Sequence, residues 1–185
     1  MKYSMRGNVD PFIVMDVMEN ARKAEEGGRK IIHMEVGQPS TAAPSDALER
    51  TSQIIKSNPL GYTVALGLPE LRKKISDLYG RWYNLDLDPS RVIITSGSSG
   101  AFILSFTALF EEGARVGIGA PGYPSYRQIL KSLGISPVDI VTNFENKFQP
   151  TAKDVVSQNL DGLLVASPSN PTGTMLSKDE LTDLI

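Results

Sequence analysis

The sequence predicts an α/β fold with a doubly wound, mostly parallel sheet, and two observations carry that prediction. From residue 91 onward, short apolar segments alternate with segments of helical periodicity, which is typical of consecutive strand–helix–strand units. One of the apolar segments, residues 162–166 (GLLVA), contains no polar side chain. A strand that is covered by helices on both faces is expected to be apolar in this way.

The alternation defines the individual elements of the predicted sheet. The predicted strands are residues 91–95, 115–119, 135–141 and 162–166. The predicted helices are residues 99–110, 125–133 and 151–158, with one more helix opening after Ser177. The first of these helices is apolar on nearly all sides, which predicts that it is deeply buried. Thr151-x-x-Asp154 and Ser177-x-x-Glu180 match the capping pattern at the start of a helix.

Residues 1–42 are expected to form an N-terminal arm and a segment of a separate small lobe. A helix is predicted to begin at Pro11, because proline is favoured in the first turn, and to end at Gly27-Gly28. Residues 31–36 are predicted to form a short strand. His33 lies in that segment and is interpreted as a structural residue rather than a general base.

Residues 43–185 are expected to be the N-terminal portion of a larger domain, cut short within its last predicted helix. The helix over residues 45–56 is predicted to be capped by Ser45. The next helix begins near Pro69, and its apolar residues recur at helical spacing, which predicts one buried face. Arg72, on that helix, is interpreted as a partner in a structural ion pair.

Composition narrows the function classes. The 185 residues are 41% hydrophobic and 22% charged, with a net charge of −2, so no basic footprint for nucleic acid or a membrane surface is expected. There is no cysteine and a single histidine, which excludes disulfides, thiolate metal sites and any site that needs two histidines. No apolar run approaches the roughly 20 residues of a membrane span, and a cytoplasmic setting is the default expectation.

Three loops follow predicted strands, at the edge of a doubly wound sheet where ligands bind. The first contains Gly97, Ser98 and Ser99 before a helix. Small residues at a helix N-terminus let an anion approach the backbone N–H groups, although an ordinary turn with serine caps would have the same sequence. In the second loop Tyr123 stands between two prolines, which suits either stacking on a planar ligand or simple packing.

The third loop carries Asn170 after the most apolar strand. Its side-chain amide can donate and accept hydrogen bonds, and the neighbouring prolines stiffen the loop. The amide could bind a ligand, or it could close a tight turn on its own backbone.

These residues carry a family resemblance. Asn170-Pro171-Thr172-Gly173, after an apolar strand, resembles the signature of the class I/II aminotransferases, which are fold-type I enzymes that depend on pyridoxal 5'-phosphate (PLP). Tyr62-x-x-x-x-Gly67-x-Pro69-Glu70-Leu71-Arg72 is similar to a second signature of the family, and Glu35-Val36-Gly37-Gln38-Pro39 is similar to its conserved glycine–proline turn. The motifs occur in the family's order and the resemblance spans nearly the whole chain.

The resemblance implies a role for each matching residue. Gly97, Ser98 and Ser99 match the loop that holds the PLP phosphate. Tyr123 matches the aromatic residue that stacks on the pyridine ring, and Asn170 matches the side chain that hydrogen-bonds the phenolic oxygen of that ring.

Two further matches concern the substrate and a second subunit. Tyr62 matches the tyrosine that reaches the phosphate from the partner subunit, which implies a homodimer. Gly37 matches the glycine whose backbone lies near the substrate carboxylate.

The activity implied is transfer of an amino group between an amino acid and a 2-oxo acid, with PLP as the electron sink. In the family, the Schiff-base lysine, the aspartate at the pyridine nitrogen and the substrate-binding arginine come at positions later than Ile185. No catalytic residue is therefore assigned, and the 185-residue chain is expected to be inactive alone. A PLP-dependent C–S lyase or a related enzyme of the same fold, and a non-catalytic fragment, remain the alternatives.

Overall fold

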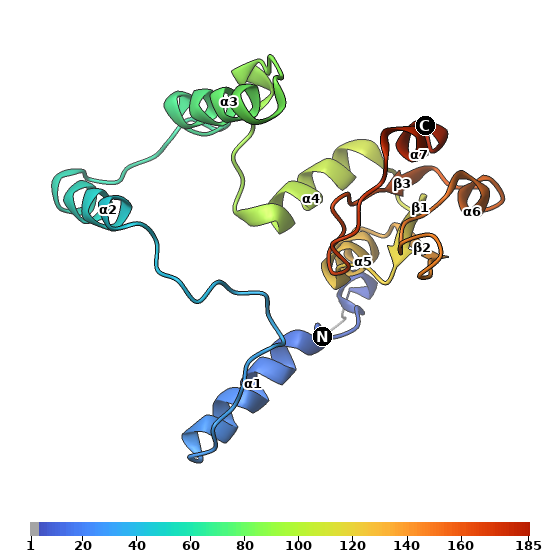
Figure 1. Ribbon diagram of the computed structural model, residues 1–185, viewed down its shortest axis with the longest axis horizontal. Helices are drawn as coiled ribbons and strands as arrows, with labels where there is room; N and C mark the ends of the chain where they lie inside the picture. The colour runs from blue at the N-terminus through green and yellow to red at the C-terminus, as the bar shows by residue number, and fades with distance from the viewer. Residues whose placement is uncertain (1–3) are drawn as a thin grey trace. The chain divides into compact units, whose positions relative to one another are not determined.

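The computed structural model describes residues 4–185, which divide into two compact units (Figure 1). Unit 1 consists of the described part of Met1–Phe12 together with Ser96–Ile185. Unit 2 is Ile13–Thr95. The expected boundary between a small lobe and a large domain at residues 42 and 43 stays a prediction.

Unit 1 is built on a three-stranded parallel sheet with the strand order β2-β1-β3. The strands are β1 (Arg115–Ala120), β2 (Ser136–Val141) and β3 (Gly162–Leu164). In the register, Val116 of β1 lies opposite Pro137 on one side and Gly162 on the other. The parallel sheet predicted from the alternating pattern is confirmed for these strands.

The crossover helices lie on opposite faces of this sheet. α5 (Pro124–Ser132) joins β1 to β2, and α6 (Ala152–Val156) joins β2 to β3. In the order β2-β1-β3, α5 leads from the central strand to one edge of the sheet, and α6 leads back in the opposite direction, past β1 to the other edge. Because such connections are right-handed, a reversal of direction places the two helices on opposite faces, and Figure 1 shows α5 and α6 on either side of the strands. The unit is therefore doubly wound.

The main core of unit 1 lies between the sheet and the helices α4 (Gly97–Leu109) and α5. Its buried members are Phe106, Val116, Ile118, Leu130 and Ile135. Burying an aliphatic side chain of this size stabilises the fold by roughly 1.5–3 kcal/mol, so this cluster is a principal source of stability.

The opposite face of β1 is covered as closely. A Cβ atom added at Gly117 would lie 2.6 Å from a methyl of Leu160 and 2.9 Å from a methyl of Leu163. Only a residue without a side chain fits here. The central strand is thus packed on both faces, as predicted for this class of sheet.

Helix α4 differs from its prediction. Phe106 is buried, and Phe102 and Phe110 pack against the core beside it. In contrast, Ile103, Leu104 and Leu109 are 45%, 59% and 71% exposed. Deep burial on all sides was the wrong prediction, because an apolar helix is buried only on the sides where other elements pack, and the described part of unit 1 packs against one side.

The predicted helix starts are confirmed where a capping box was expected. The Thr151 hydroxyl accepts from the N–H of Asp154, and the Asp154 carboxylate accepts from the Thr151 N–H at 3.0 Å. Ser177 and Glu180 form the same reciprocal pair at the start of α7 (Lys178–Asp183). Each box satisfies two N–H groups that have no partner within the helix.

The N-terminal segment packs against the rest of unit 1. It contains the short 3-10 helix η1 (Met5–Gly7). The Asp10 carboxylate lies 2.6 Å from the Lys131 ammonium of α5, and this hydrogen bond lowers the pKa of Asp10. The Phe12 ring meets the Tyr123 ring edge-on, with 6.1 Å between centroids. Residues 4–12 therefore touch the loop that carries a candidate site residue.

Unit 2 contains three α-helices of the described chain, α1 (Ile13–Glu26), α2 (Ser45–Ser57) and α3 (Pro69–Tyr83), and one short 3-10 helix. All three were predicted, with shifts at their ends. The helix α2 begins at Ser45 as predicted, but Ser45 is not its cap, because Pro44 is the N-cap. The Ser45 hydroxyl instead donates to the Asp46 carboxylate at 3.3 Å.

The predicted strands over residues 31–36 and 91–95 are wrong. Residues 31–36 have no strand partner within the described chain, and Ile32 and Met34 are more than four-fifths exposed. Val92 has an extended backbone. Next to it, the Ile94 N–H donates to the Leu66 carbonyl at 3.0 Å, but this single backbone hydrogen bond does not make a strand pair. Apolar β-branched sequence favours extended backbone, whereas a strand also needs a neighbour that takes its hydrogen bonds.

Helix α3 is held by polar contacts more than by a buried apolar face. The Arg72 guanidinium donates to the carbonyls of Val92 at 2.7 Å and of the first residue of η2 (Pro89–Arg91) at 2.9 Å. The predicted ion pair of Arg72 is therefore wrong, although its structural role is confirmed. Ser76 is buried and donates to the Leu87 carbonyl. Trp82, placed by its spacing on a buried face, is 67% exposed.

Candidate functional site

A small hollow lies at the carboxyl ends of β1 and β3, where the parallel strands end at the same edge of the sheet. The loop after β1 contributes Pro121 and Gly122, and the loop after β3 contributes Ser169 and Asn170. Tyr126, Gln149 and Leu164 are among its other lining residues. This is the position at which ligands bind in doubly wound sheets.

The loop after β1 makes a turn that only glycine allows. A Cβ atom at Gly122 would lie 2.4 Å from the Gly119 carbonyl oxygen. Tyr123 follows as the N-cap residue of α5, and Pro124 occupies the first turn of that helix. The turn and the proline together determine where the Tyr123 side chain leaves the backbone.

The Tyr123 ring is held by aromatic neighbours. Its centroid is 6.1 Å from that of Phe12 and 5.3 Å from that of Tyr126, both in edge-to-face geometry. Tyr126 in turn meets Phe102 of α4 at 5.0 Å. Burial raises the pKa of Tyr126, with a smaller contribution from Tyr123. Edge-to-face contacts of this kind stabilise ring orientation beyond area burial, so these contacts favour one orientation of the Tyr123 ring.

The loop after β3 is closed by its own backbone. The Ser169 N–H donates to the Thr174 carbonyl at 2.9 Å, and the Gly173 N–H donates to the Ser169 carbonyl at 2.8 Å. Gly173 has a φ of +70°, a conformation that glycine adopts without strain. The Asn170 side chain makes no hydrogen bond to its own backbone within residues 4–185, so the alternative of a self-closing asparagine is not what the structure shows. Asn170 is exposed at the rim of the hollow.

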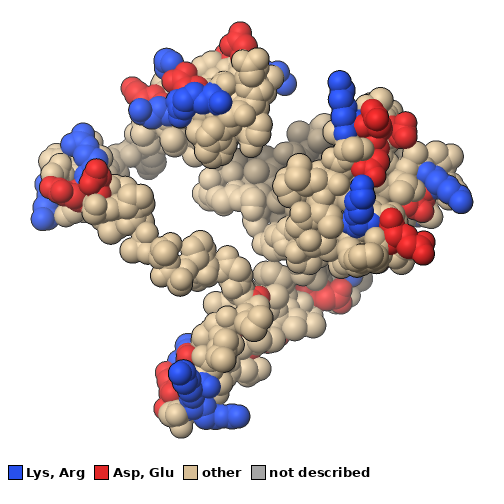
Figure 2. Space-filling model, viewed as in Figure 1, with Lys and Arg blue, Asp and Glu red and all other residues tan. Residues whose placement is uncertain are grey.

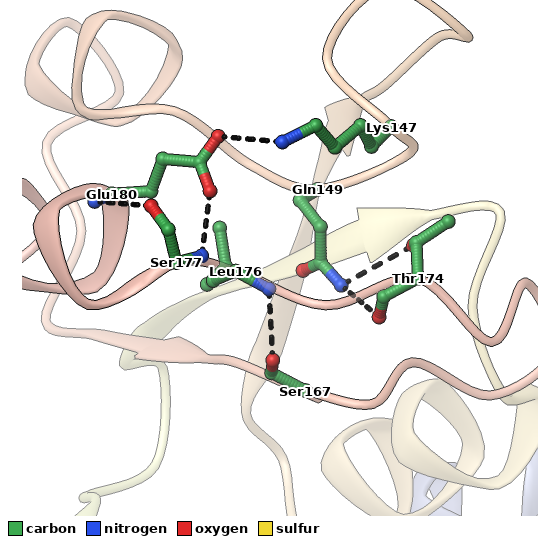
Figure 3. Close-up of polar contacts among 7 residues, drawn as sticks. All are labelled: Lys147, Gln149, Ser167, Thr174, Leu176, Ser177 and Glu180. Atoms are coloured by element: carbon green, nitrogen blue, oxygen red, sulfur yellow. Dashed lines mark hydrogen bonds and ion pairs between the residues drawn. The ribbon is translucent and has the colours of Figure 1, made fainter.

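A buried glutamine supports this loop, although no sequence motif points to it. Gln149 is 3% exposed, and its amide nitrogen donates to the Thr174 carbonyl at 2.8 Å (Figure 3). The same nitrogen donates to the Ala166 carbonyl at 3.2 Å. Nearby, the Ser167 hydroxyl accepts from the Leu176 N–H at 2.9 Å. The segment around Asn170 is therefore bound from inside the protein as well as by its own backbone.

The start of α4 has the properties of an anion site. The N-cap Ser96 makes no side-chain capping bond, and the first turn carries no acidic residue. Ser98 and Ser99 are exposed there, and Gly97 has a φ of +73°. An N-terminus of this kind presents the positive end of the helix dipole. Gly97–Ser99 are not among the described residues that line the hollow, so the structure does not itself join them to Asn170.

The remaining two predicted residues, Gly37 and Tyr62, belong to unit 2. The Tyr62 side chain is fully exposed. Gly37 is exposed as well, and a Cβ atom there would meet nothing within 4 Å. Of the predicted site residues, the structure brings Asn170 together with the loop that precedes Tyr123.

The surface charge is mixed. Figure 2 shows basic and acidic side chains side by side over α1, α2, α3 and unit 1 on the face that it draws. Many are paired, as Arg22 is with Glu26 at 2.5 Å and Lys73 with Asp77 at 3.0 Å. No helix within residues 4–185 combines the length and the apolar character that a bilayer crossing requires.

Comparison with known proteins places this arrangement in a family. The family model described as aminotransferase class I and II matches residues 29–185. The chain belongs to this family. Membership confirms the resemblance seen in the motifs, and it makes the chain part of an enzyme family whose members move amino groups.

Individual aminotransferases are similar over nearly the whole chain. Valine–pyruvate aminotransferase of Mycobacterium tuberculosis is 42% identical over 182 residues, which cover 97% of this chain and 47% of that protein. A crystal structure from Silicibacter pomeroyi, named as a candidate aminotransferase, is 59% identical with a TM-score of 0.88, covering 100% of this chain and 47% of that one. An aminotransferase structure from Mycobacterium tuberculosis has a TM-score of 0.93 at 41% identity, covering 100% and 48%. The chain thus spans about half the length of the relatives that it matches.

Proposed function

We propose that this chain provides part of the PLP site of a transaminase. The observation that carries the proposal is the hollow at the carboxyl ends of β1 and β3, where Asn170 stands beside the loop that leads to Tyr123 in a member of the aminotransferase family. In this proposal, Asn170 binds the phenolic oxygen of the cofactor and Tyr123 stacks on its ring. Gly97, Ser98 and Ser99 bind its phosphate.

The residues fit the chemistry of the cofactor. A phosphate dianion is favoured at the start of α4, where Ser96 makes no side-chain capping bond and no carboxylate lies in the first turn. An aromatic ring held by Phe12 and Tyr126 can stack without first being ordered. The exposed Asn170 amide has a donor to offer to a phenolic oxygen. When bound, PLP supplies the electron sink for reactions at the α-carbon of an amino acid.

In this proposal, the residues of the chain bind and orient the cofactor and the substrate. Asn170 and Tyr123 fix two sides of a planar ring, while the start of α4 fixes the phosphate. Gly37 is proposed to lie beside the substrate carboxylate, where a residue without a side chain leaves the backbone accessible. Tyr62, fully exposed in unit 2, is proposed to reach the phosphate of a partner subunit, so that the complete enzyme is a homodimer in the cytoplasm.

The proposed reaction transfers an amino group between an amino acid and a 2-oxo acid. The relatives similar to this chain are named as aminotransferases, among them a valine–pyruvate and several aspartate aminotransferases. These names favour transamination over a C–S lyase reaction, which would use the same cofactor contacts.

Equilibrium dialysis of the 185-residue chain against PLP tests the site. The wild-type chain is expected to take up PLP weakly and reversibly. Asn170→Ala is expected to weaken binding about tenfold, the equivalent of one hydrogen bond at ~1.4 kcal/mol. Asn20→Ala on α1, in unit 2, is the matched control and is expected to bind as the wild type does. Absence of saturable uptake, or equal affinity in both variants, would contradict the proposal.

The same preparation is expected to show no transamination. No lysine is among the residues that line the hollow in the described part of the chain, and the amine that anchors the cofactor in this chemistry is a lysine. Oxo-acid formation from an amino-acid donor, PLP and the purified chain measures this. Steady turnover that persists after repurification would show that a lysine of this chain serves as the anchor.

A further inference from the structure

Gln149 is a buried polar side chain in the segment between β2 and α6, and it lies outside every motif that carries the family resemblance. It is 3% exposed. A buried amide destabilises a protein unless its hydrogen bonds are satisfied. Here both strong contacts of the amide nitrogen go to backbone carbonyls of one segment, those of Ala166 and Thr174.

These two carbonyls lie on either side of Asn170 along the chain. Ala166 precedes the loop and Thr174 follows it, so a single amide joins the start of the loop to its end. Figure 3 shows the contacts with Thr174. The amide nitrogen is also 3.4 Å from the Thr174 hydroxyl, which itself lies 2.9 Å from the Thr172 hydroxyl. The backbone bond between Ser169 and Thr174 closes the same loop from inside.

The reach of the side chain matters. Both hydrogens of the amide are used, one for each side of the loop, which requires an NH2 group at this distance from the backbone. Asparagine would place its amide one methylene short. Glutamate would keep the shape but would present a carboxylate to two carbonyl oxygens, which repel it.

We propose that Gln149 is the positioning residue for Asn170: by joining Ala166 to Thr174 it holds the loop in the shape from which Asn170 reaches a bound ring. This inference rests on the proposed function for the ligand, while the link between Ala166 and Thr174 rests on the contacts above. Gln149 also lines the hollow, but its amide nitrogen donates to the loop backbone, so its proposed effect on the ligand runs through Asn170.

Hydrogen exchange in the 185-residue chain tests, without any ligand, whether the two hydrogen bonds of Gln149 stabilise the loop. The reporters are the amides of Ser169, Gly173 and Leu176, whose acceptors all lie in the loop segment. In Gln149→Glu at pH 7.5 their protection is expected to fall at least about tenfold. The amides of β1 and β2 are expected to keep theirs. If the β1 and β2 amides lose their protection, Gln149→Glu has not folded. Gln149→Asn then replaces it, with a smaller expected loss of protection at the loop amides.

A pH comparison separates the hydrogen bond from simple packing. At pH 5 the buried carboxyl of the Glu variant takes up a proton, because burial favours its neutral form, and it can then donate to one carbonyl. Protection at the loop amides is expected to recover in part, relative to the wild type measured at both pH values. Gln158→Glu is the matched control: its carbonyl accepts from Arg115 at the amino end of β1, and it is expected to leave the loop unchanged.

A double-mutant cycle on PLP affinity tests the route through Asn170. Gln149→Glu alone is expected to raise the PLP dissociation constant about tenfold, and to have almost no effect when Asn170 is already alanine. A loosened loop with unchanged PLP affinity, or additive effects of the two substitutions, would overturn the inference.

The outcomes also separate this inference from the proposed function. If the wild-type chain takes up no PLP while the loop still loosens, the proposed function is wrong and the role of Gln149 in holding the loop is supported. If the chain binds PLP and the Glu variant matches it in both affinity and loop protection, the inference falls and the proposed function stands.

Discussion

Substitution of Gly122 by alanine tests how the fold aims the Tyr123 loop. The added Cβ atom would lie 2.4 Å from the Gly119 carbonyl oxygen, whereas a carbon and a carbonyl oxygen ordinarily meet at about 3.3 Å. Relief of the clash therefore needs a shift of about 0.9 Å in backbone that follows the central strand. Overpacking of this kind costs about 1–3 kcal/mol, and we expect the upper part of that range because no flexible side chain can move aside.

The assay must report on unit 1. The single tryptophan, Trp82, lies in unit 2, so its fluorescence follows the wrong part of the chain. Hydrogen exchange of β1 amides in increasing urea reports on the sheet itself. With a urea dependence of about 2 kcal/mol per molar, a loss of about 2–3 kcal/mol lowers the midpoint for Gly122→Ala by about 1–1.5 M.

The control is Gly7→Ala in the same unit, where an added Cβ atom meets nothing within 4 Å. Its effect is expected to stay within about 0.5 kcal/mol. A Gly122→Ala chain that is as stable as this control would refute the claim that the turn requires glycine.

Two further predictions concern unit 2 and the start of α6. Hydrogen bonds from His33 to Glu35 and to Glu25 raise the pKa of His33, so NMR titration of its ring should give a value above 6.5. The stability that these contacts add is fully present below the unfolded pKa and is lost as pH rises through the raised folded pKa; a titration at or below 6.5 would contradict the contacts. Thr151→Ala removes the capping box with Asp154 and should lower the stability of unit 1 by about 1 kcal/mol, measured by urea titration, and an unchanged midpoint would show that the cap contributes nothing.

Local signals in the sequence predicted local structure well. The capping boxes at Thr151 and Ser177 depend on residues within one turn of each other, and the structure has both of them. The parallel sheet also followed from the sequence, because a βαβ alternation has few other solutions.

Features that depend on distant partners could not be predicted in this way. The apolar segment 91–95 looks like a strand, yet pairing requires a neighbour that no local pattern reveals. The exposure of Leu104 on α4 depends on which elements pack against the helix. Arg72 was expected to meet a carboxylate, but its acceptors are carbonyls of Val92 and Pro89, and backbone acceptors have no signature in sequence.

The residues of the candidate site also differ in whether a local sequence motif marks them. Gly97–Ser99, Tyr123 and Asn170 stand in motifs, so the sequence pointed to them. Gln149 does not, because a glutamine between a phenylalanine and a proline is indistinguishable from an ordinary loop residue. Its importance follows only from the two carbonyls that the fold brings to it.

The central claim is that PLP binds where the start of α4, the Tyr123 loop and the Asn170 loop present their groups. Hydrogen exchange of the 185-residue chain with and without saturating PLP tests it most directly. Slower exchange is expected at residues 97–100, 121–126 and 167–174 together, with unit 1 amides at the amino ends of the strands unaffected. Slowing confined to other segments, or at one of the three alone, would contradict the claim that these loops form a single cofactor site.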